Sequence, residues 1–413
     1  MDTLYDSAWV LEQIEQIAQF SQDKPNITRL AFTPADHQAR NYMSKLMENC
    51  GLNVEIDAIG NIIGQFQPAD VESHVPVVAT GSHLDTMPSG GKYDGVLGVL
   101  CGLAAVSRIR HRGEVKHPLK VIAFAAEESS RFNLANMGSK AMAGLAHIPT
   151  WKRLKDHNGV SLADELEAMG LLIERLATAA CSQNSIKGFV ELHIEQGQVL
   201  AQRKMNIGIV DTISAPTRLK IIVTGTAGHS GVTDIADRQD ALVSAAMIVL
   251  SVRNIAAEYE YQGAVATVTA LHTYPGTANV IVDRVELWVD IFGTVHENIV
   301  DILQEIKDAI SSITEDYGTP AAIDVVTSEK AIKLDAAINR IIEKNCRQLN
   351  LRSMRIDSRT AHSAMNIARI APSALLIIPC KDSINHNSRE YTASYDIAAG
   401  LDVLTETLYQ LAK

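Results

Sequence analysis

Apolar residues recur along the chain with two different periods, and these periods predict where helices and strands lie. In residues 5–21 the apolar positions fall three or four apart, the spacing of a helix with one buried face. Residues 75–80 and 119–126 are short apolar runs that lead into charged or glycine-rich loops, as buried parallel strands do. Residues 95–110 are predicted to form a buried helix between them. This order predicts an α/β domain on a parallel or mixed sheet.

The pattern of apolar and polar residues changes near residue 210, where a second domain is predicted. Periodicity predicts six elements in this stretch: a strand at 218–227, a helix at 238–259, strands at 264–274 and 284–294, a helix at 297–315 and a strand at 321–327. Strand–helix–strand–strand–helix–strand is the order of a ferredoxin-like α+β sandwich. We interpret residues 212–328 as an inserted domain of this kind.

After the insertion the first pattern returns. A helix is predicted at 334–348, a strand at 374–379 and a final helix at 394–411. The sequence therefore predicts a discontinuous first domain, residues 1–211 and 329–413, with a central mixed sheet flanked by helices. The inserted domain, of roughly 115 residues, is within the usual range of domain sizes.

Composition narrows the functional classes. The chain has 413 residues and a formal net charge of −11, which argues against the concentrated basic face of a nucleic-acid-binding protein. The N-terminal segment does not have the charge pattern of a signal peptide, and no run of eighteen apolar residues predicts a membrane span. The five cysteines are scattered and never form a CxxC pair, so we expect a reduced, cytoplasmic setting.

The loop after the first predicted strand contains three residues typical of a metal site. It reads GSHLDTMPSGGKYDGVLG and holds His83, Asp85 and Asp94. His83 and Asp85 lie two apart on an extended chain, so one can bind a metal while the other orients it. Asp94 precedes a predicted helix, where its carboxylate could bridge two ions. Alone, this loop is equally a polar turn with an aspartate helix cap.

Adjacent glutamates end the next predicted strand. Glu127 and Glu128 follow the apolar run LKVIAFAA, where burial of their charges is costly unless a metal or a proton compensates. Their side chains point apart, so one can bind a metal and the other can act as a general base toward water. The competing interpretation is a solvated pair at a strand exit.

Two further histidines complete the set. His193 lies in the alternating run FVELHIEQG, and His386 lies in a loop after the strand ALLIIP. Taken singly, the first is a satisfied core histidine and the second a turn residue. Together with the two loops above, they supply nitrogen and oxygen ligands without a thiolate, which favours zinc, manganese or cobalt in a hydrolytic site.

These motifs resemble the hydantoinase/carbamoylase branch of the zinc aminoacylase and carboxypeptidase superfamily. The resemblance rests on GSHLDT, GGKYDGVLG, AAEESSRF, VELHIEQG and the late histidine–asparagine pair, in the same order along nearly the whole chain. That branch includes N-carbamoyl-L-amino acid hydrolases, allantoate amidohydrolases and β-ureidopropionases. The resemblance implies two divalent ions per subunit, zinc first and manganese, cobalt or nickel as alternatives.

The resemblance also implies roles for individual residues. One ion would be held by His83, Asp94 and His193, and the other by Asp94, Glu128 and His386, so that Asp94 bridges them. Asp85 would orient His83, and Glu127 would be the general base. The inserted domain would be a lid through which the chain forms a homodimer.

Inside the insertion, the segment GTAGHSGVTDIADRQDAL places His229 where it would reach the tetrahedral intermediate, in its own or the partner's site. Asn279 in PGTANVI matches an asparagine of the family that contacts substrate. As alternatives, His229 is a polar loop residue and Asn279 a turn residue.

Several positions that read the substrate depart from the family pattern. Phe292 stands where the family has an arginine that is thought to grip the substrate carboxylate, and Ala215-Pro216 replaces Gly-Gln. Residues 358–364 keep His362 but lose its glycine and aspartate neighbours, and Val232-Thr233-Asp234 replaces Thr-Thr-Pro. The candidate substrate contacts are therefore Gln196, Arg218, Asn279, Arg359 and His362, with Arg218 or Arg359 as a relocated carboxylate grip.

The sequence thus predicts a metal-dependent amidohydrolase that cleaves a linear amide or ureido C–N bond of a small substrate. An N-acyl-amino acid or dipeptide hydrolase with the same metal centre is the alternative enzyme. A non-catalytic binding protein on the same scaffold is the alternative from another functional class.

Overall fold

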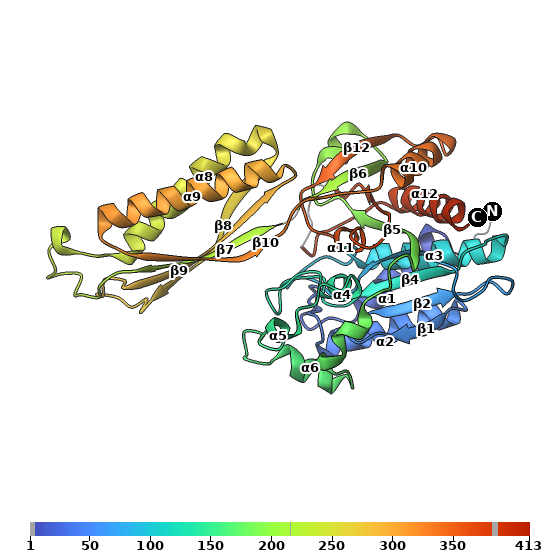
Figure 1. Cartoon of the computed structure of the whole chain (residues 1–413), viewed down its shortest axis with the longest axis horizontal. Coiled ribbons are helices and arrows are strands. Elements are labelled where there is room, and N and C mark those ends of the chain that lie inside the picture. The colour runs from blue at the N-terminus through green and yellow to red at the C-terminus, as the bar shows by residue number, and fades with distance from the viewer. Residues whose placement is uncertain (1–4, 215, 382–386) are drawn as a thin grey trace. The chain divides into compact units, whose positions relative to one another are not determined.

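The computed structural model describes residues 5–214, 216–381 and 387–413, and the chain divides into two compact units (Figure 1). Unit 1 comprises Met1–Asp211, Leu334–Ile356 and His362–Lys413. Unit 2 comprises Thr212–Lys333 and Asp357–Ala361. Unit 2 thus takes in a few residues beyond the 212–328 insertion expected from the sequence.

Unit 1 is built on a large mixed sheet. The strand order is β1-β2-β4-β3-β5-β13-β6-β11, and β12 also pairs with β6. The strands are β1 (Asn53–Ile56), β2 (Ile62–Phe66), β3 (Val77–His83), β4 (Leu119–Phe124), β5 (Ile186–Ile194), β6 (Ile207–Ile213), β11 (Ile332–Lys333), β12 (Ser353–Ser358) and β13 (Ser373–Ile378).

The centre of this sheet is parallel. β3 runs parallel to both β4 and β5, and β13 runs parallel to β5. The outer pairs β1–β2, β2–β4 and β13–β6 are antiparallel. All residues of β3 and β13 are buried, which explains why these strands have continuous apolar runs rather than alternation. The carboxyl ends of the parallel strands therefore meet at one edge of the sheet.

Helices cover this sheet and form the main core with it. The helix α3 (Val96–Arg112) is buried along most of its length and packs with α1 and α12 and against β3 and β5. Asp6 caps α1 by accepting hydrogen bonds from two backbone amides, and Thr33 caps α2 with Pro34 as its first residue. The other long helices of unit 1 are α1 (Ser7–Ala18), α2 (Pro34–Asn49), α10 (Ala336–Gln348) and α12 (Ser394–Ala412).

The sequence pattern did not predict several short helices of unit 1. Those within residues 137–179 pack on a separate apolar cluster, which includes Phe32, Phe132, Trp151 and Leu162. Four to seven residues are too few to show a helical period, and glycines with positive φ end several of these segments. They are α4 (Met137–Met142), α5 (Ile148–Trp151), α6 (Leu162–Ala168), η2 (Ile173–Ala179), α7 (Val199–Arg203) and α11 (Ser363–Ile367).

Unit 2 is a four-stranded antiparallel sheet with two long helices packed on it, in the strand order β10-β7-β9-β8. The isoleucines of α9 at 299, 302, 306, 310 and 313 fall three or four apart and are buried, so its sequence specifies one packed face. Its elements are β7 (Thr217–Thr224), η3 (Ile235–Asp237), α8 (Ala241–Tyr259), η4 (Glu260–Gln262), β8 (Ala264–Tyr274), β9 (Arg284–Gly293), α9 (His296–Tyr317) and β10 (Ala321–Ser328).

One helix among the described residues is long and apolar enough to cross a membrane by length and composition alone. It is α8 with the turn that follows it, Ala241–Gln262. One face of α8, which includes Ala245, Ile248 and Val252, is buried in the core of unit 2. The helix therefore packs through one apolar face, and a second apolar face, which includes Val243, Met247 and Leu250, is exposed.

Candidate metal centre

The carboxyl ends of two neighbouring strands carry the candidate ligands in unit 1. His83 is the last residue of β3, and His193 is the residue before the end of β5. Asp94 lies just before α3, which begins at Val96. Because β3 and β5 are parallel neighbours, these side chains start from the edge of the sheet at which open α/β sheets bind ligands.

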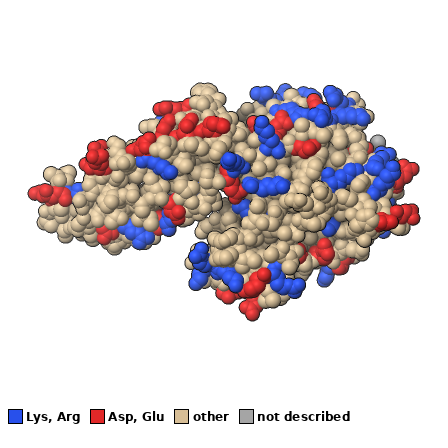
Figure 2. Space-filling model, viewed as in Figure 1, with Lys and Arg blue, Asp and Glu red and all other residues tan. Residues whose placement is uncertain are grey.

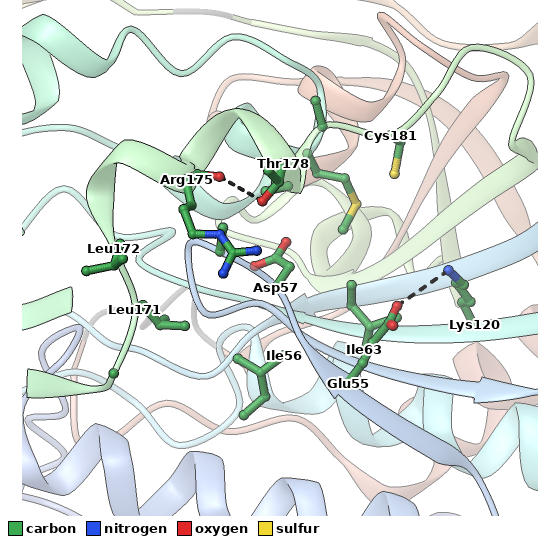
Figure 3. A pocket seen from close by; sticks show the side chains of 15 residues that line it. Glu55, Ile56, Asp57, Ile63, Lys120, Leu171, Leu172, Arg175, Thr178 and Cys181 are labelled. Carbon is green, nitrogen blue, oxygen red and sulfur yellow. Dashed lines mark hydrogen bonds and ion pairs between the residues drawn. The ribbon is translucent and has the colours of Figure 1, made fainter. Parts of the chain in front are cut away.

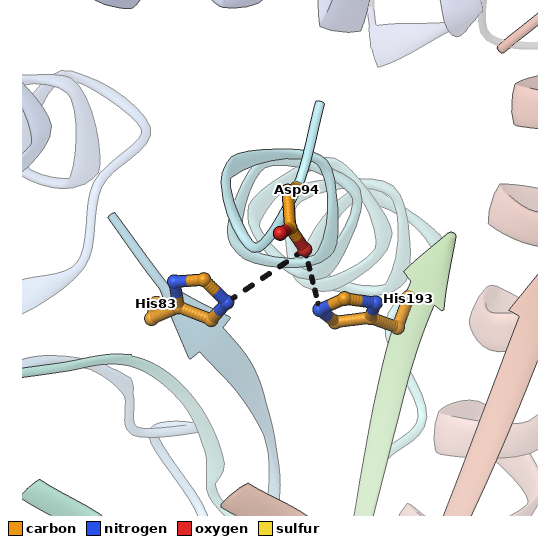
Figure 4. A group of neighbouring side chains, drawn as sticks. All are labelled: His83, Asp94 and His193. Carbon is orange, nitrogen blue, oxygen red and sulfur yellow. Dashed lines mark ion pairs between the residues drawn. The ribbon is translucent and has the colours of Figure 1, made fainter. Parts of the chain in front are cut away.

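His83, Asp94 and His193 converge on one point (Figure 4). The Nε2 atom of His193 lies 3.1 Å from Oδ1 of Asp94, and Nε2 of His83 lies 4.0 Å from the same oxygen. One ligand atom from each side chain lies within 4.8 Å of the others, and all three residues are buried. Bonds of about 2.0–2.2 Å to zinc place ligand atoms roughly 3–4 Å apart around one ion. This spacing suits a single bound ion.

Gly95 lets the chain pass close to the ring of His83. It has a φ of +67°, and an added Cβ would lie 2.5 Å from the ring of His83. Only glycine therefore allows the Asp94 backbone to turn into α3 this close to the imidazole.

Asp85 orients His83 in a different way from the one expected. Its backbone carbonyl lies 2.8 Å from Nδ1 of His83, whereas its carboxylate Oδ1 lies 3.8 Å from that nitrogen. The carboxylate instead accepts hydrogen bonds from the backbone amides of Glu127 and Glu128, at 3.1 and 2.9 Å. The two successive amides at the end of β4 form a better donor pair for it. The carbonyl contact still assigns the proton of a neutral ring to Nδ1, which leaves Nε2 for a metal.

Glu127 and Glu128 lie at the same edge of the sheet, directly after β4. Oε2 of Glu127 is 3.7 Å from Nε2 of His83, and Glu127 is buried. Burial, followed by the charges of Asp85 and Asp94, raises the pKa of Glu127 well above its usual range. Burial and the charge of Glu127 raise the pKa of Glu128 in the same way. A buried carboxyl group with a raised pKa beside candidate ligands is a candidate general acid–base group.

His362 belongs to this centre as well. Its buried ring lies edge-on to that of His193, with 4.6 Å between ring centroids. Burial alone lowers the pKa of His193, but the hydrogen bond with Asp94 and the charge of Asp94 raise it to about 9. Burial and the neighbouring His193 lower the pKa of His362 well below its usual range. His362 is therefore a neutral imidazole next to the candidate ligands.

Sequence reasoning missed two buried carboxylates that support the centre. Glu191, on β5, accepts hydrogen bonds from Ser82 Oγ at 2.9 Å and from the amide of Ala364 at 2.7 Å. Glu390 accepts from the amides of Tyr93 and Asp94. Burial raises the pKa of Glu191, and burial with the charge of Asp94 raises that of Glu390 to about 7. A charged residue inside the buried strand FVELHI was the available signal for Glu191.

A buried arginine that the sequence reasoning also missed supports the His83 loop. The guanidinium of Arg29 is inaccessible to solvent and donates hydrogen bonds to the carbonyls of Leu84, Ile17 and Phe20, at 2.7, 3.1 and 2.9 Å. Burial lowers the pKa of Arg29 to about 10, against the opposing charges of Asp36 and Asp85. Arg29 therefore remains a cation under the loop that carries His83.

Comparisons with known proteins decide the family. A model of peptidase family M20/M25/M40 matches residues 79–410. An N-carbamoyl-L-amino acid amidohydrolase of Geobacillus stearothermophilus is 33% identical over 394 residues, which cover 95% of each chain. A ureidoglycolate hydrolase of Oryza sativa subsp. japonica is 32% identical over 413 residues, covering 98% of this chain and 85% of that one.

The chain belongs to peptidase family M20/M25/M40. A solved amidase of the hydantoinase/carbamoylase family from Burkholderia vietnamiensis has a TM-score of 0.91 to this chain and 29% identity, and covers 100% of this chain and 99% of its own. The resemblance stated from the motifs is thus confirmed, and the similarity extends through both units.

Two candidate residues of this M20-family chain lie side by side in unit 2. His229 and Val280 form an isolated β-bridge, and the amide of Ser230 donates to the carbonyl of Asn279 at 3.0 Å. His229 is exposed, and its Nδ1 accepts a hydrogen bond from the amide of Gly231 at 3.0 Å. In the neutral form of the ring the proton is therefore on Nε2, which makes that nitrogen a hydrogen-bond donor.

The two arginines suggested as carboxylate grips differ in their surroundings. Arg218 pairs with Asp290 on the neighbouring strand, with its Nε and Nη2 at 2.6 and 2.9 Å from the two carboxylate oxygens. This bidentate pair occupies the fork that a substrate carboxylate would need. Arg359 is exposed. Phe292 is half-buried two residues after Asp290. Of the two arginines, Arg359 thus has the accessible guanidinium.

The remaining site predictions have a simple outcome. Gln196 is half-buried and follows β5 by two residues, close in sequence to His193. His386 lies outside the described residues.

A separate cavity of about 460 Å³ lies in unit 1 and contains none of the predicted site residues (Figure 3). Within it, Lys120 lies 3.9 Å from Glu55, and the carboxylate of Asp57 accepts hydrogen bonds from Asn61. Its acidic groups are thus already engaged within the protein. The candidate metal centre is therefore the His83–Asp94–His193 cluster, which this cavity does not include.

Proposed function

We propose that this protein is a dinuclear metal-dependent amidohydrolase that cleaves a linear amide or ureido C–N bond of a small substrate. The observation that carries the proposal is the convergence of His83, Asp94 and His193 within 4.8 Å of one another. Carboxyl groups surround this point, and Arg29 is the buried cation beneath its His83 loop. The carboxyl groups are those of Asp85, Asp94, Glu127, Glu128, Glu191 and Glu390.

The donor set fits divalent ions. Imidazole nitrogens and carboxylate oxygens without a thiolate suit zinc, and also manganese, cobalt or nickel. The first ion would be held by His83, Asp94 and His193. By the family resemblance, the second would be held by Asp94, Glu128 and His386. Burial and the neighbouring carboxylates raise the pKa values of Glu127 and Glu128, and bound cations would oppose this shift by balancing the negative charges.

The chain's own residues would carry the proton. When bound, the ions supply Lewis-acid polarisation and lower the pKa of water. Glu127, 3.7 Å from Nε2 of His83, is placed to take a proton from water and to hand it to the leaving nitrogen. Nε2–H of His229 would donate to the developing oxyanion, a contact worth roughly 3–4 kcal/mol in other hydrolases.

We infer that the substrate is a small ureido or amido acid. The relatives named above are an N-carbamoyl-L-amino acid amidohydrolase and a ureidoglycolate hydrolase, which supports a ureido group. The engagement of Arg218 by Asp290, together with Phe292, supports a carboxylate grip that differs from the usual one, with Arg359 as the candidate. An N-acyl-amino acid or dipeptide remains the alternative substrate class.

The decisive experiment is a substrate panel with metal analysis. The full chain would be loaded with zinc, manganese, cobalt or nickel and assayed for ammonia or amine release from N-carbamoyl-L-amino acids, allantoate, ureidoglycolate, N-acetyl amino acids and dipeptides. We expect two ions per chain and turnover of ureido acids. Preferred turnover of N-acyl acids or dipeptides would select the alternative enzyme. Less than one ion per chain and no hydrolysis would favour a binding protein.

We also propose that unit 2 is a ferredoxin-like lid that forms a homodimer. Val243, Met247 and Leu250 lie on one face of α8 and are 42, 39 and 57% exposed. β8 is an eleven-residue strand at an edge of the sheet, and an open edge of this length is a template for pairing. An apolar helix face beside an open strand edge suits a self-complementary interface.

Replacing Leu250 with glutamate tests the dimer. A charge at the centre of the exposed α8 face should convert the dimer to a monomer in sedimentation or light-scattering measurements. Ile56→Glu is the matched control, because Ile56 is 54% exposed on β1 of unit 1. A wild-type protein that is monomeric at all concentrations would contradict the proposal. We further propose a cytoplasmic location, which the five free cysteines support.

A further inference from the structure

Glu390 links two loops of unit 1 that are far apart in sequence. It lies in the segment between β13 and α12 and is 3% exposed. Its Oε1 accepts hydrogen bonds from the backbone amides of Tyr93 and Asp94, at 2.8 and 3.0 Å. One carboxylate oxygen therefore holds the peptide groups on both sides of the Tyr93 α-carbon.

The surroundings of Glu390 are shaped to this carboxylate. Its Oε2 is buried and has no hydrogen-bond partner among the described residues. A Cβ added to Gly91 would lie 2.1 Å from the carboxyl carbon and from Oε1. Glycine at this position is therefore required for the carboxylate to reach the Asp94 loop. A second contact joins the same segments, because the rings of Tyr93 and Tyr391 meet edge to face at 6.2 Å.

Burial of a carboxylate is costly for folding, which raises the question of what Glu390 contributes to the Asp94 loop. The contribution suggested by the geometry is the direction of the Asp94 side chain. Two hydrogen bonds to Oε1 hold the backbone from which Asp94 projects toward His193 and His83. Freed from them, Asp94 would lose the fixed direction that a metal ligand requires.

We propose that Glu390 is a positioning residue that holds Asp94 in the orientation needed to bind metal, through the hydrogen bonds that its Oε1 accepts. This inference rests on the proposed metal-dependent function. It adds a structural tie between the Asp94 loop and the segment after β13. His386, the remaining ligand implied by the resemblance, precedes Glu390 by four residues in that segment. Glu390 thus acts on metal binding through Asp94 and does not itself touch a reacting atom.

The experiment compares three variants of the full chain by metal titration of the metal-free protein with cobalt and zinc. Glu390→Met removes the acceptor at similar length and should weaken binding of at least one ion by roughly 10- to 100-fold, as loss of a ligand's outer partner does. Glu390→Gln keeps an acceptor oxygen and should stay close to wild type. In Gly91→Ala the added methyl group should displace the Glu390 carboxylate, so this variant should lose metal affinity as Glu390→Met does. The visible spectrum of bound cobalt reports the ligand geometry independently of activity.

The matched control is Asp57→Leu. Asp57 also accepts two backbone hydrogen bonds in unit 1, from Ile59 and Asn61 at 3.1 and 2.8 Å, but not from the Asp94 loop. It should lower thermal stability and leave metal affinity unchanged. Cooperative melting of each metal-free variant shows that it is folded, and Gly91→Ala serves if Glu390→Met does not fold.

Three results are distinguishable. Wild-type affinity and an unaltered cobalt spectrum in both Glu390→Met and Gly91→Ala would overturn the positioning role. Equal losses in Glu390→Gln and Glu390→Met would overturn the hydrogen-bond explanation. A wild-type chain that binds no metal would remove the proposed function itself, before any variant is compared.

Discussion

Acidic side chains gather in both units, but they are balanced in different ways. On the unit 2 sheet, Asp290 pairs with Arg218, and Glu286 lies 3.0 Å from Lys220 and 3.3 Å from Arg284. Although partial burial alone would raise it, the pKa of Glu286 is lowered by its hydrogen bond with Lys220. At the centre in unit 1, the pKa values of Glu127 and Glu128 are raised well above the usual range.

The difference shows where a cation is needed. Asp290 and Glu286 have lysine or arginine partners, Arg218 and Lys220 from the neighbouring strand β7 and Arg284 from their own strand β9. Charges of opposite sign also lie near one another on the surface: acidic and basic side chains intermingle over much of the face in Figure 2. Basic side chains gather near α10 and β12. The buried carboxyl groups around the His83–Asp94–His193 cluster lie beside histidines and one another instead. Such a concentration is stable only if protons or metal ions balance it.

The largest expected effect is that of removing metal, which should act on the candidate centre of unit 1 and not on the paired carboxylates of unit 2. Dialysis against a chelator should abolish hydrolysis, and it should lower the free energy of unfolding by about 4 kcal/mol if the ions are present at a thousand times their dissociation constant. Re-addition of zinc or manganese should restore both. Equal melting temperatures with and without metal would show that the unit 1 centre does not need a cation.

Glu127→Gln should stop the chemistry without emptying the site. We expect kcat to fall by roughly 10²- to 10⁴-fold, the usual contribution of a general base, while two ions remain bound. The measurement is steady-state kinetics with metal content on the same sample. Activity near the wild-type level would remove Glu127 from its role.

Arg218→Met should lower the stability of unit 2 and leave the candidate metal centre of unit 1 unchanged. It leaves Asp290, which is 8% exposed, without its partner, so unit 2 should lose about 3 kcal/mol of stability. Metal content should not change, because the pair lies in unit 2. Chemical denaturation and metal analysis together check both parts, and an altered metal stoichiometry would contradict the separation of the two regions.

Asp57→Asn tests a carboxylate with a raised pKa outside the candidate metal centre. Burial raises the pKa of Asp57 to about 6 from an ordinary value of 3.8. The folded state thus holds this proton more tightly, so its stabilising contribution is complete below pH 3.8 and is lost as the pH rises through 6. The variant should lack this loss, on the order of 3 kcal/mol, because the pKa rises from 3.8 to about 6 and one pKa unit is about 1.4 kcal/mol. Parallel pH–stability curves for both proteins would refute it.

The sequence predicted most of the long elements because their periods are local. Strands 119–126 and 264–274 appear as β4 and β8, and helices 238–259 and 297–315 appear as α8 and α9. The short helices between Met137 and Ala179 were not predicted, since segments of four to seven residues show no period. The outer strands β1, β2 and β6 were also missed.

At the metal centre, residue types were foreseen and contacts were not. The motifs selected His83, Asp94 and His193, and the structure brings these three together. Asp85 was expected to use its carboxylate on His83, yet that carboxylate binds the amides of Glu127 and Glu128. A sequence does not show which of two nearby donors an acceptor will choose, because that depends on the path of the backbone.

By itself, the sequence determined the kinds of side chain available for chemistry and the strands that carry them. The reason is that the apolar periodicity of an element depends only on residues that are neighbours in the chain. Only the tertiary structure decided which of these side chains meet. Glu390 reaches the amide of Asp94 across 296 residues of chain, and Arg218 finds Asp290 across 72. Such pairs depend on strand order and on how loops cross the sheet edge, which are set by packing of the whole domain rather than by any local pattern.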